Sequence, residues 1–293
     1  MSKNRHIKFS IFFFIACLIL VNQSVLADSI KFGVQAPRGN ATAMKKWSEL
    51  GKYLEVKIGQ KVEIIPLKPN KTVAAVDAGK VHFMLSNPAI AVMLQTKNKS
   101  IPIATLNKKS GNQFAGVIIS KKGSGIQNAD DLKGKRVMAY KFKKSAAAYI
   151  FQVKHLKDKG IDISNFSEFK EAKKQDDIVM AVKVGATDVG FIRTGLLESM
   201  KKEGKISFDD FIIVDKVKDD FPQIHSTILY PEWTVTAASS VDKATKEKVA
   251  SALFNISKDE PVSKKANILG FIKPNSLDAL ISTLKDLKLA PFN

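Results

Sequence analysis

Strand-like and helix-like patterns alternate along most of the chain, and this alternation constrains the fold most. Residues 29–34 alternate in polarity as a strand does, and a helical pattern with an apolar face follows the loop 35–40. The same order of strand, loop and helix recurs at 136–140 and from Ser145 onward. Such alternation is typical of α/β proteins, so we expect an α/β fold with mainly parallel central sheets.

The first 27 residues have the pattern of a secretory signal peptide. Basic residues come first, residues 9–21 are almost entirely apolar, and Ala27 is the small residue expected before the cleavage site. The apolar run of about 13 residues is shorter than the roughly 20 that a membrane-spanning helix needs. We expect cleavage after Ala27 and a periplasmic mature chain that does not span a membrane. Lipoprotein processing at Cys17 is the less favoured alternative, because the apolar run continues after it.

The net charge of +19 comes almost entirely from lysine. Only four of the 47 basic residues are arginine, and the lysines are spread over the whole length. Nucleic-acid binders usually enrich arginine or cluster their basic residues, so we expect no nucleic-acid partner. The three arginines outside the leader are Arg38, Arg136 and Arg193. Arg136 begins a strand, away from any carboxyl end, and we interpret it as structural.

The residues that usually carry catalysis or bind metals form no convincing group. Cys17 is the only cysteine, so the mature chain would have no thiolate ligand or cysteine nucleophile. The histidines are scattered without metal-ligand spacing, and acidic pairs such as Asp176-Asp177 are typical of helix caps and solvated faces. We therefore expect no metal, no cofactor and no enzyme activity.

Two loops that follow strands place polar residues at the start of a helix. Arg38 and Asn40 follow the first strand, and Lys141, Ser145 and Ala146 follow the strand 136–140. Parallel sheets bind ligands at the carboxyl ends of their strands, and helix N-termini attract anions. Both loops are therefore candidate anion sites, although which of three lysines in the second loop faces a ligand stays open: Lys141, Lys143 or Lys144.

Three other segments offer further candidate ligands for an anion. They are Arg193-Thr194 at a strand end, Ser86-Asn87 before a helix, and His225-Ser226. Each candidate also has a structural explanation, such as a solvated loop, a plain helix cap, a salt bridge between elements or a satisfied core histidine. The residues alone leave both explanations open.

A faint internal repeat suggests two units of similar architecture. The pattern A-V-x-x-G occurs at 75–79 and again at 181–185, each time before a strand. Two similar units would place their strand-loop-helix segments on opposite sides of one cleft.

Several segments resemble the phosphate/phosphonate type of ABC-transporter substrate-binding proteins, which have the type II periplasmic binding protein fold. They read IKFGVQAPRG, FAGVIISKKGSGIQNADDLKGKRVMAY and VGATDVGFIRTGLLE. The segments FAGVII, GFIRTGLLE and HSTILYPEW are also similar to the periplasmic input domain of tetrathionate-sensing histidine kinases. The family's ligand loop commonly reads Ser-Thr-Ser-Gly, whereas this chain has Ser-Ala-Ala-Ala from Ser145, which argues against a specific preference for phosphonate.

The resemblance implies two lobes joined by two crossing strands. The first lobe would comprise residues 28–117 and 228–293, and the second residues 118–227. It also implies capture of a small oxyanion, phosphate-like, phosphonate-like or containing sulfur, between the lobes. The partner would be an ABC permease or, alternatively, a membrane sensor kinase.

Overall fold

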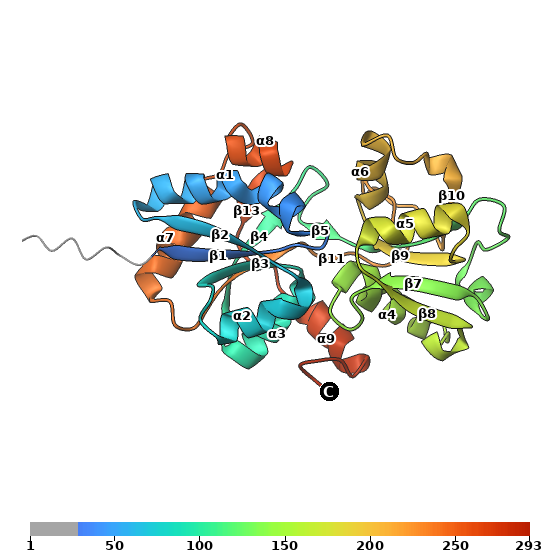
Figure 1. Cartoon of the computed structure of the whole chain (residues 1–293). Coiled ribbons are helices and arrows are strands. Elements are labelled where there is room, and N and C mark those ends of the chain that lie inside the picture. The colour runs from blue at the N-terminus through green and yellow to red at the C-terminus, as the bar shows by residue number, and fades with distance from the viewer. Residues whose placement is uncertain (1–28) are drawn as a thin grey trace, which may run out of the picture.

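The computed structural model describes residues 29–293, so the expected signal peptide lies outside the described residues. Figure 1 shows two lobes side by side, each built around its own sheet. The six-stranded sheet of the first lobe has the order β13 (Gly270–Ile272), β4 (Ile101–Asn107), β12 (Thr234–Ala237), β3 (Phe83–Ser86), β1 (Ile30–Gln35) and β2 (Val62–Leu67). The five-stranded sheet of the second has the order β10 (Phe211–Val214), β6 (Gly116–Lys121), β9 (Val189–Arg193), β7 (Arg136–Tyr140) and β8 (Glu168–Ala172).

Helices pack around both sheets. The first lobe carries α1 (Asn40–Ile58), α2 (Thr72–Asp77), α3 (Pro88–Asn98), α7 (Lys243–Phe254) and α8 (Pro261–Ala266). The second carries α4 (Phe151–Asp158), α5 (Gln175–Val184) and α6 (Leu196–Lys202). Short 3-10 turns lie at Pro69–Lys71, Ala129–Leu132, Ile163–Asn165 and Phe208–Asp210. Within residues 29–293, no helix combines the length and apolarity that crossing a membrane requires.

The same three-stranded parallel unit lies at the centre of each lobe. In the first lobe β1 pairs in parallel with β2 and β3, and in the second β7 pairs in parallel with β8 and β9. The two A-V-x-x-G segments end α2 and α5, the helices that precede β3 and β9, so the faint repeat corresponds to equivalent positions. The next strands along each sheet, β12 and β6, pair antiparallel with β3 and β9. Each sheet is therefore mixed, and the mainly parallel pairing that the sequence predicts holds for the central unit.

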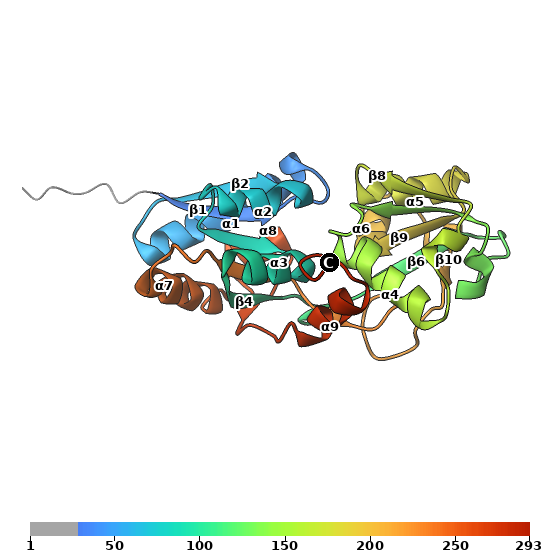
Figure 2. The ribbon, with the colours of Figure 1, turned by 90° about the horizontal axis from the view of Figure 1, so that it is seen from below.

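The chain passes between the lobes at β5 (Gln113–Phe114) and β11 (Tyr230–Pro231), which pair antiparallel. The Tyr230 ring stacks on Phe151 of α4, with ring centroids 3.9 Å apart. Figure 2 shows α9 (Asp278–Asp286) at the junction beside α4, and Lys157 Nζ donates to an Asp286 carboxylate oxygen at 2.8 Å. We propose that the chain divides into lobes near 117/118 and 227/228, close to these crossings; the first strand of the second sheet, β6, already begins at Gly116.

Helix α1 packs against the first lobe through its apolar face, and its N-terminus lies at the lobe junction. Its inner face buries Trp47, Leu50 and Leu54 at helical spacing, while Met44, one turn before Trp47, is 37% exposed. The helix ends at Gly59, which adopts the left-handed conformation with φ 64° that glycine tolerates. The N-terminus of α1 lies directly after the β1 loop and therefore points toward the second lobe (Figure 1).

The helix expected from Ser145 begins irregularly. Residues Ala146–Ile150 form one π-helical turn before α4, and the Ser145 side chain makes no capping hydrogen bond. Helix α4 ends at Asp158, and Gly160 just beyond it has a φ of 75°, a conformation that glycine tolerates.

Candidate functional site

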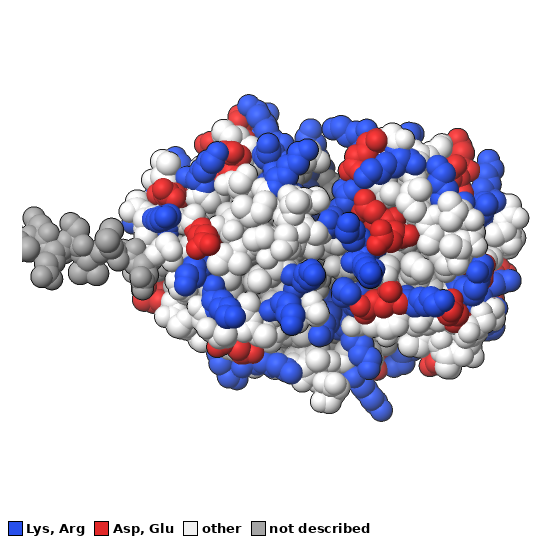
Figure 3. Space-filling view, in the orientation of Figure 1, with Lys and Arg blue, Asp and Glu red and all other residues white. Residues whose placement is uncertain are grey.

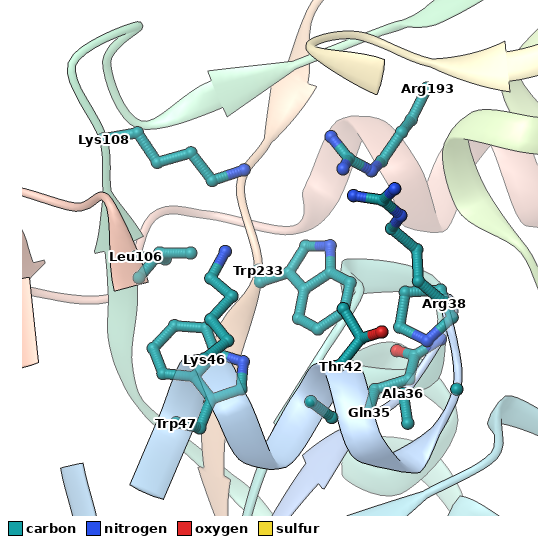
Figure 4. Close-up of a pocket in the computed structure, with 13 residues that line it drawn as sticks. Gln35, Ala36, Arg38, Thr42, Lys46, Trp47, Leu106, Lys108, Arg193 and Trp233 are labelled. Atoms are coloured by element: carbon teal, nitrogen blue, oxygen red, sulfur yellow. The ribbon is translucent and has the colours of Figure 1, made fainter. Parts of the chain in front are cut away.

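A pocket lies at the junction of the lobes, beside the N-terminal turns of α1 (Figure 4). It encloses about 570 Å³ of space between atoms, part of it open to solvent. We call it the cationic pocket, and its lining residues are Gln35, Ala36, Pro37, Arg38, Gly39, Thr42, Ala43, Lys46, Trp47, Leu106, Lys108, Arg193 and Trp233. Arg193 comes from β9 of the second lobe, whereas most of the lining comes from the first.

Four basic side chains line this pocket: Arg38, Lys46, Lys108 and Arg193. Figure 3 shows basic side chains spread over both lobes and along their junction, with acidic ones on the second lobe beside it. The pocket therefore lies in a generally basic surface. What distinguishes its four cations is how each is paired.

Lys108 is paired with a buried acid. Its ammonium donates to the carboxylate of Glu232, which is only 1% exposed and also accepts the Trp233 backbone N–H at 2.9 Å. Burial lowers the pKa of Lys108, although the Glu232 carboxylate opposes that shift. The charge of Lys108 is thus compensated locally.

Lys46 makes no ion pair with any residue of 29–293. Its Nζ lies 4.9 Å from the centre of the Trp47 ring, a cation–π contact. Burial disfavours the ammonium, and the positive charges of Lys108 and Arg193 add repulsion, so the pKa of Lys46 falls to about 7. An anion beside Lys46 would relieve this electrostatic cost.

Arg193 is the second cation without an acidic partner in the described chain. Its Nη1 donates to the Thr194 carbonyl at 2.7 Å, and its backbone N–H donates to Gln175 Oε1 at 3.3 Å. Burial lowers its pKa from the ordinary value. The salt bridge between elements that the sequence left open for Arg193 is absent within residues 29–293.

Arg38 lies in the pocket but is already engaged across the lobe junction. Its guanidinium forms a bidentate pair with Asp176 of α5, at 2.9 and 2.6 Å, and two hydrogen bonds of 3.1 Å with Glu203 after α6. These contacts raise the pKa of Arg38 and lower that of Glu203 to about 2. Lys205 also pairs with Glu203 at 2.6 Å. Arg38 therefore joins the lobes here, a partner set that the sequence did not reveal.

A smaller adjoining pocket brings together other expected residues. Asn87, Ser145 and Ala146 line it together with Arg193 and Trp233, around about 260 Å³ of space. The Asn87 side chain caps α3 by accepting two backbone N–H groups, and its Nδ2 donates across the junction to the Lys144 carbonyl at 3.3 Å. Gln35 and Pro37 of the first strand-loop-helix segment also line this pocket, so the two segments face each other across the junction.

The other expected residues lie outside both pockets. Asn40 is exposed at the first turn of α1, and Lys141 pairs with Glu171 at 2.6 Å. Ser86 is buried, and its hydroxyl has no hydrogen-bond partner within residues 29–293. Thr194 is buried and accepts the Ala115 backbone N–H at 3.4 Å.

His225 and Ser226 have structural partners. His225 is buried, with Nδ1 2.8 Å from the Thr227 carbonyl and Nε2 3.0 Å from an Asp219 carboxylate oxygen. The Ser226 hydroxyl accepts the backbone N–H of Ile118 at 2.9 Å. These contacts fasten the returning segment to β6. Residues 227–229 form no strand, and β11 begins at Tyr230.

Sequence reasoning missed Lys46, Lys108 and Trp233. Trp233 belongs to the HSTILYPEW segment, whose similarity to sensor input domains does not indicate that Trp233 lines a pocket. No local pattern distinguishes Lys46 or Lys108 from the other lysines, because their burial depends on contacts from distant parts of the chain. Arg136 is structural, as expected, since it pairs with Asp188 at 2.6 Å. No group of three or more His, Cys, Asp or Glu residues in 29–293 is arranged to hold a metal ion.

A comparison with models of protein families identifies the family of this chain. Residues 32–279 match the family described as ABC transporter, phosphonate, periplasmic substrate-binding protein. The chain belongs to this family. Its members are substrate-binding proteins, and the chain has the type II periplasmic binding protein fold that the resemblance implied.

Solved structures agree on the fold. PhnD1 from Prochlorococcus marinus, in complex with methylphosphonate, is similar with a TM-score of 0.73 and 17% identity, over 89% of this chain and 98% of PhnD1. A binding protein component of an ABC phosphonate transporter from Pseudomonas aeruginosa has a TM-score of 0.73 and 14% identity, over 88% of this chain and 85% of that one. Both likenesses concern the fold.

A curated relative has higher sequence identity. The tetrathionate sensor histidine kinase TtrS of Salmonella typhimurium is 30% identical over 248 residues. The match covers 82% of this chain but 42% of the kinase, so the chain spans less than half of that relative's length.

Proposed function

We propose that this protein captures a small oxyanion in the cationic pocket, in the periplasm, and delivers it to an ABC permease. One observation carries the proposal: Lys46 and Arg193 are partly buried at the lobe junction, and neither has an acidic partner in residues 29–293. Buried charges are normally paired, and the Glu232 carboxylate, already paired with Lys108, offsets the charges of Lys46 and Arg193 only in part. Two cations without an ion pair of their own in one pocket therefore favour an anionic ligand.

The two cations come from different lobes, which suggests how binding promotes closure. An anion held by Lys46 of α1 and Arg193 of β9 would bridge the lobes. Proteins of this architecture close around ligands by hinge motion. Charge-assisted hydrogen bonds contribute about 1.5–3 kcal/mol each. Three or four of them, less the costs of closure and ordering, are compatible with micromolar affinity at about −8 kcal/mol.

The second loop supports an oxyanion class broader than phosphonate. Ser145 lines the smaller pocket, but Ala146 and Ala147 beside it offer methyl groups where the family commonly has hydroxyls. This loop therefore offers a ligand one side-chain hydroxyl, that of Ser145, and the methyl group of Ala146, rather than several hydroxyl groups. We propose that the main electrostatic attraction comes from Lys46 and Arg193.

A sensory role is the alternative. The similarity to the tetrathionate sensor kinase favours a ligand-binding component that reports to a membrane histidine kinase. Both roles need the same pocket and neither needs a catalytic residue, so we propose a binding protein and not an enzyme.

The proposed binding is tested by a thermal-shift screen of the purified mature chain. The panel contains phosphate, methylphosphonate, sulfate, thiosulfate and tetrathionate. A ligand at a concentration 100 times its Kd stabilises the folded state by about 2.7 kcal/mol, which raises the Tm clearly. We expect at least one anion to give that rise. A flat response across the panel would contradict the oxyanion proposal.

A further inference from the structure

One buried amide of the second lobe holds three separate backbone segments together. Gln152, the second residue of α4, is fully buried. Its Nε2 donates to the carbonyls of Ile192 at 2.8 Å, Ala147 at 2.9 Å and Val117 at 3.3 Å. These carbonyls belong to β9, to the π-helical turn before α4 and to β6. A single side chain therefore links all three segments.

Two of these segments carry residues that line the pockets. Ile192 directly precedes Arg193, which lines both pockets, and Ala147 lines the smaller pocket together with Ser145. Gln152 itself lines neither pocket. It lies behind the site and holds the backbone from which Arg193 and Ser145 project.

Strand β6 leaves room for the amide directly opposite Arg193. Gly116 of β6 is the register partner of Arg193 in β9. A Cβ at position 116 would lie 2.6 Å from Gln152 Nε2 and 2.7 Å from its Cδ, closer than such atoms approach. Because glycine has no side chain, the amide packs against the strand at the end of the sheet where Arg193 lies.

This amide has an energetic cost. Gln152 Oε1 is buried and has no hydrogen-bond partner within residues 29–293. A buried acceptor without a partner destabilises the folded state and calls for an explanation. An apolar side chain of the same size would avoid this cost but would offer the three carbonyls no N–H donor. The donors are therefore what the amide contributes.

We propose that Gln152 is a positioning residue for anion binding, which holds Arg193 and the turn that carries Ser145 at the separation that the ligand requires. It acts through the Ile192 and Ala147 carbonyls and does not contact the ligand. Binding groups need such support, because productive contacts require them to be held within about 0.5 Å. The inference rests on the proposed function and adds to it a residue outside both pockets.

Isothermal titration calorimetry of the mature chain and of Gln152→Met tests the inference. The probes are phosphate, methylphosphonate, sulfate, thiosulfate and tetrathionate, each titrated separately. Methionine has nearly the volume of glutamine but no N–H donor. We expect Gln152→Met to bind the anion that the parent prefers at least about tenfold more weakly.

Thr187→Val is the matched control. The Thr187 hydroxyl donates to the Arg136 carbonyl at 2.9 Å, just before the end of β9 that is remote from Arg193. Both substitutions remove a buried hydrogen bond and should lower the free energy of unfolding. Only Gln152→Met should weaken binding, which separates positioning from a general loss of stability.

A double-mutant cycle tests whether Gln152 acts through Arg193. Gln152→Met should weaken binding much less in the Arg193→Gln background than in the parent, because the group that it positions is already absent. Its effect on the free energy of unfolding should be similar in both backgrounds.

The outcomes separate this inference from the proposed function. If Gln152→Met binds as tightly as the parent, or Thr187→Val loses as much affinity, the positioning role is wrong while oxyanion capture stands. Equal losses with and without Arg193 would also overturn the positioning role. If no anion binds the parent, both proposals are overturned. Circular dichroism checks folding, and Gly116→Ala, whose Cβ displaces the amide, replaces Gln152→Met if that variant does not fold.

Discussion

At the scale of single residues, Lys46 is the most informative side chain of the pocket. Its pKa of about 7 arises from burial and from the nearby charges of Lys108 and Arg193. Those neighbours come from a distant loop and from the other lobe, so the sequence around Lys46 contains no sign of the shift. An ordinary lysine would be fully charged at neutral pH, whereas this one changes charge there.

This pKa predicts opposite pH dependences for stability and binding. Between pH 7 and the ordinary value of 10.5, the unfolded chain holds a proton on Lys46 that the folded, ligand-free chain lacks. The free energy of unfolding should therefore rise with pH across that window. An anion favours the ammonium, so affinity should fall above pH 7, by at most about tenfold per pH unit.

Calorimetric titrations between pH 6 and 9 measure how the affinity for the anion changes with pH. Denaturant unfolding over the same range measures how the free energy of unfolding changes. In Lys46→Gln the pH dependence of affinity should disappear, and the rise of stability with pH should become smaller but remain in part, because burial also lowers the pKa of Lys108. An affinity that stays constant over this range in the unsubstituted protein would contradict the low pKa of Lys46.

At the scale of elements, close packing of α5 on β9 sets the position of Arg193. A Cβ on Gly190 would lie 2.6 Å from Ile178 Cγ2 and 3.0 Å from Val182 Cγ2, both on α5. Gly190→Ala should therefore lower the free energy of unfolding by about 1–3 kcal/mol, because the helix must move away from the strand. Chemical denaturation measures the change, and a variant as stable as the parent would show that α5 is not tightly packed there.

Elements whose patterns are local could be predicted from the sequence. Helix α1 and strand β7 follow from apolar periodicity, and the helix stop at Gly160 follows from the glycine. Elements such as α8 and β13 were missed because they are short and depend on tertiary contacts. Arg38 and Arg193, both candidates from the sequence, line one pocket, and their role in binding stays a prediction. The ion pair of Arg38 with Asp176 could not be predicted, because it joins residues far apart in sequence.

At the scale of the whole molecule, Arg38 connects the lobes through Asp176 and Glu203. The side chains are 20–37% exposed, so solvent and salt screen these pairs in part. Their position at the pocket makes them a contact that exists only when the lobes are close together. Arg38 thus supports closure, while Lys46 and Arg193 are left for the ligand.

The double variant Asp176→Asn, Glu203→Gln distinguishes this role from direct ligand binding by Arg38. If Arg38 supports closure, the variant should bind its anion about tenfold more weakly, a change of about 1.4 kcal/mol. Its ligand-free radius of gyration in small-angle X-ray scattering should also increase. Stronger binding by the variant would instead mean that the freed Arg38 contacts the ligand.

The central claim is that an anion binds between Lys46 and Arg193, and one titration series tests it most directly. The best-binding anion is titrated calorimetrically into the mature chain and into Lys46→Gln, Arg193→Gln and Lys45→Gln. The account predicts micromolar affinity in the parent and in Lys45→Gln, and a loss of at least about tenfold in each of the other two variants. Equal affinity in all four proteins would contradict it.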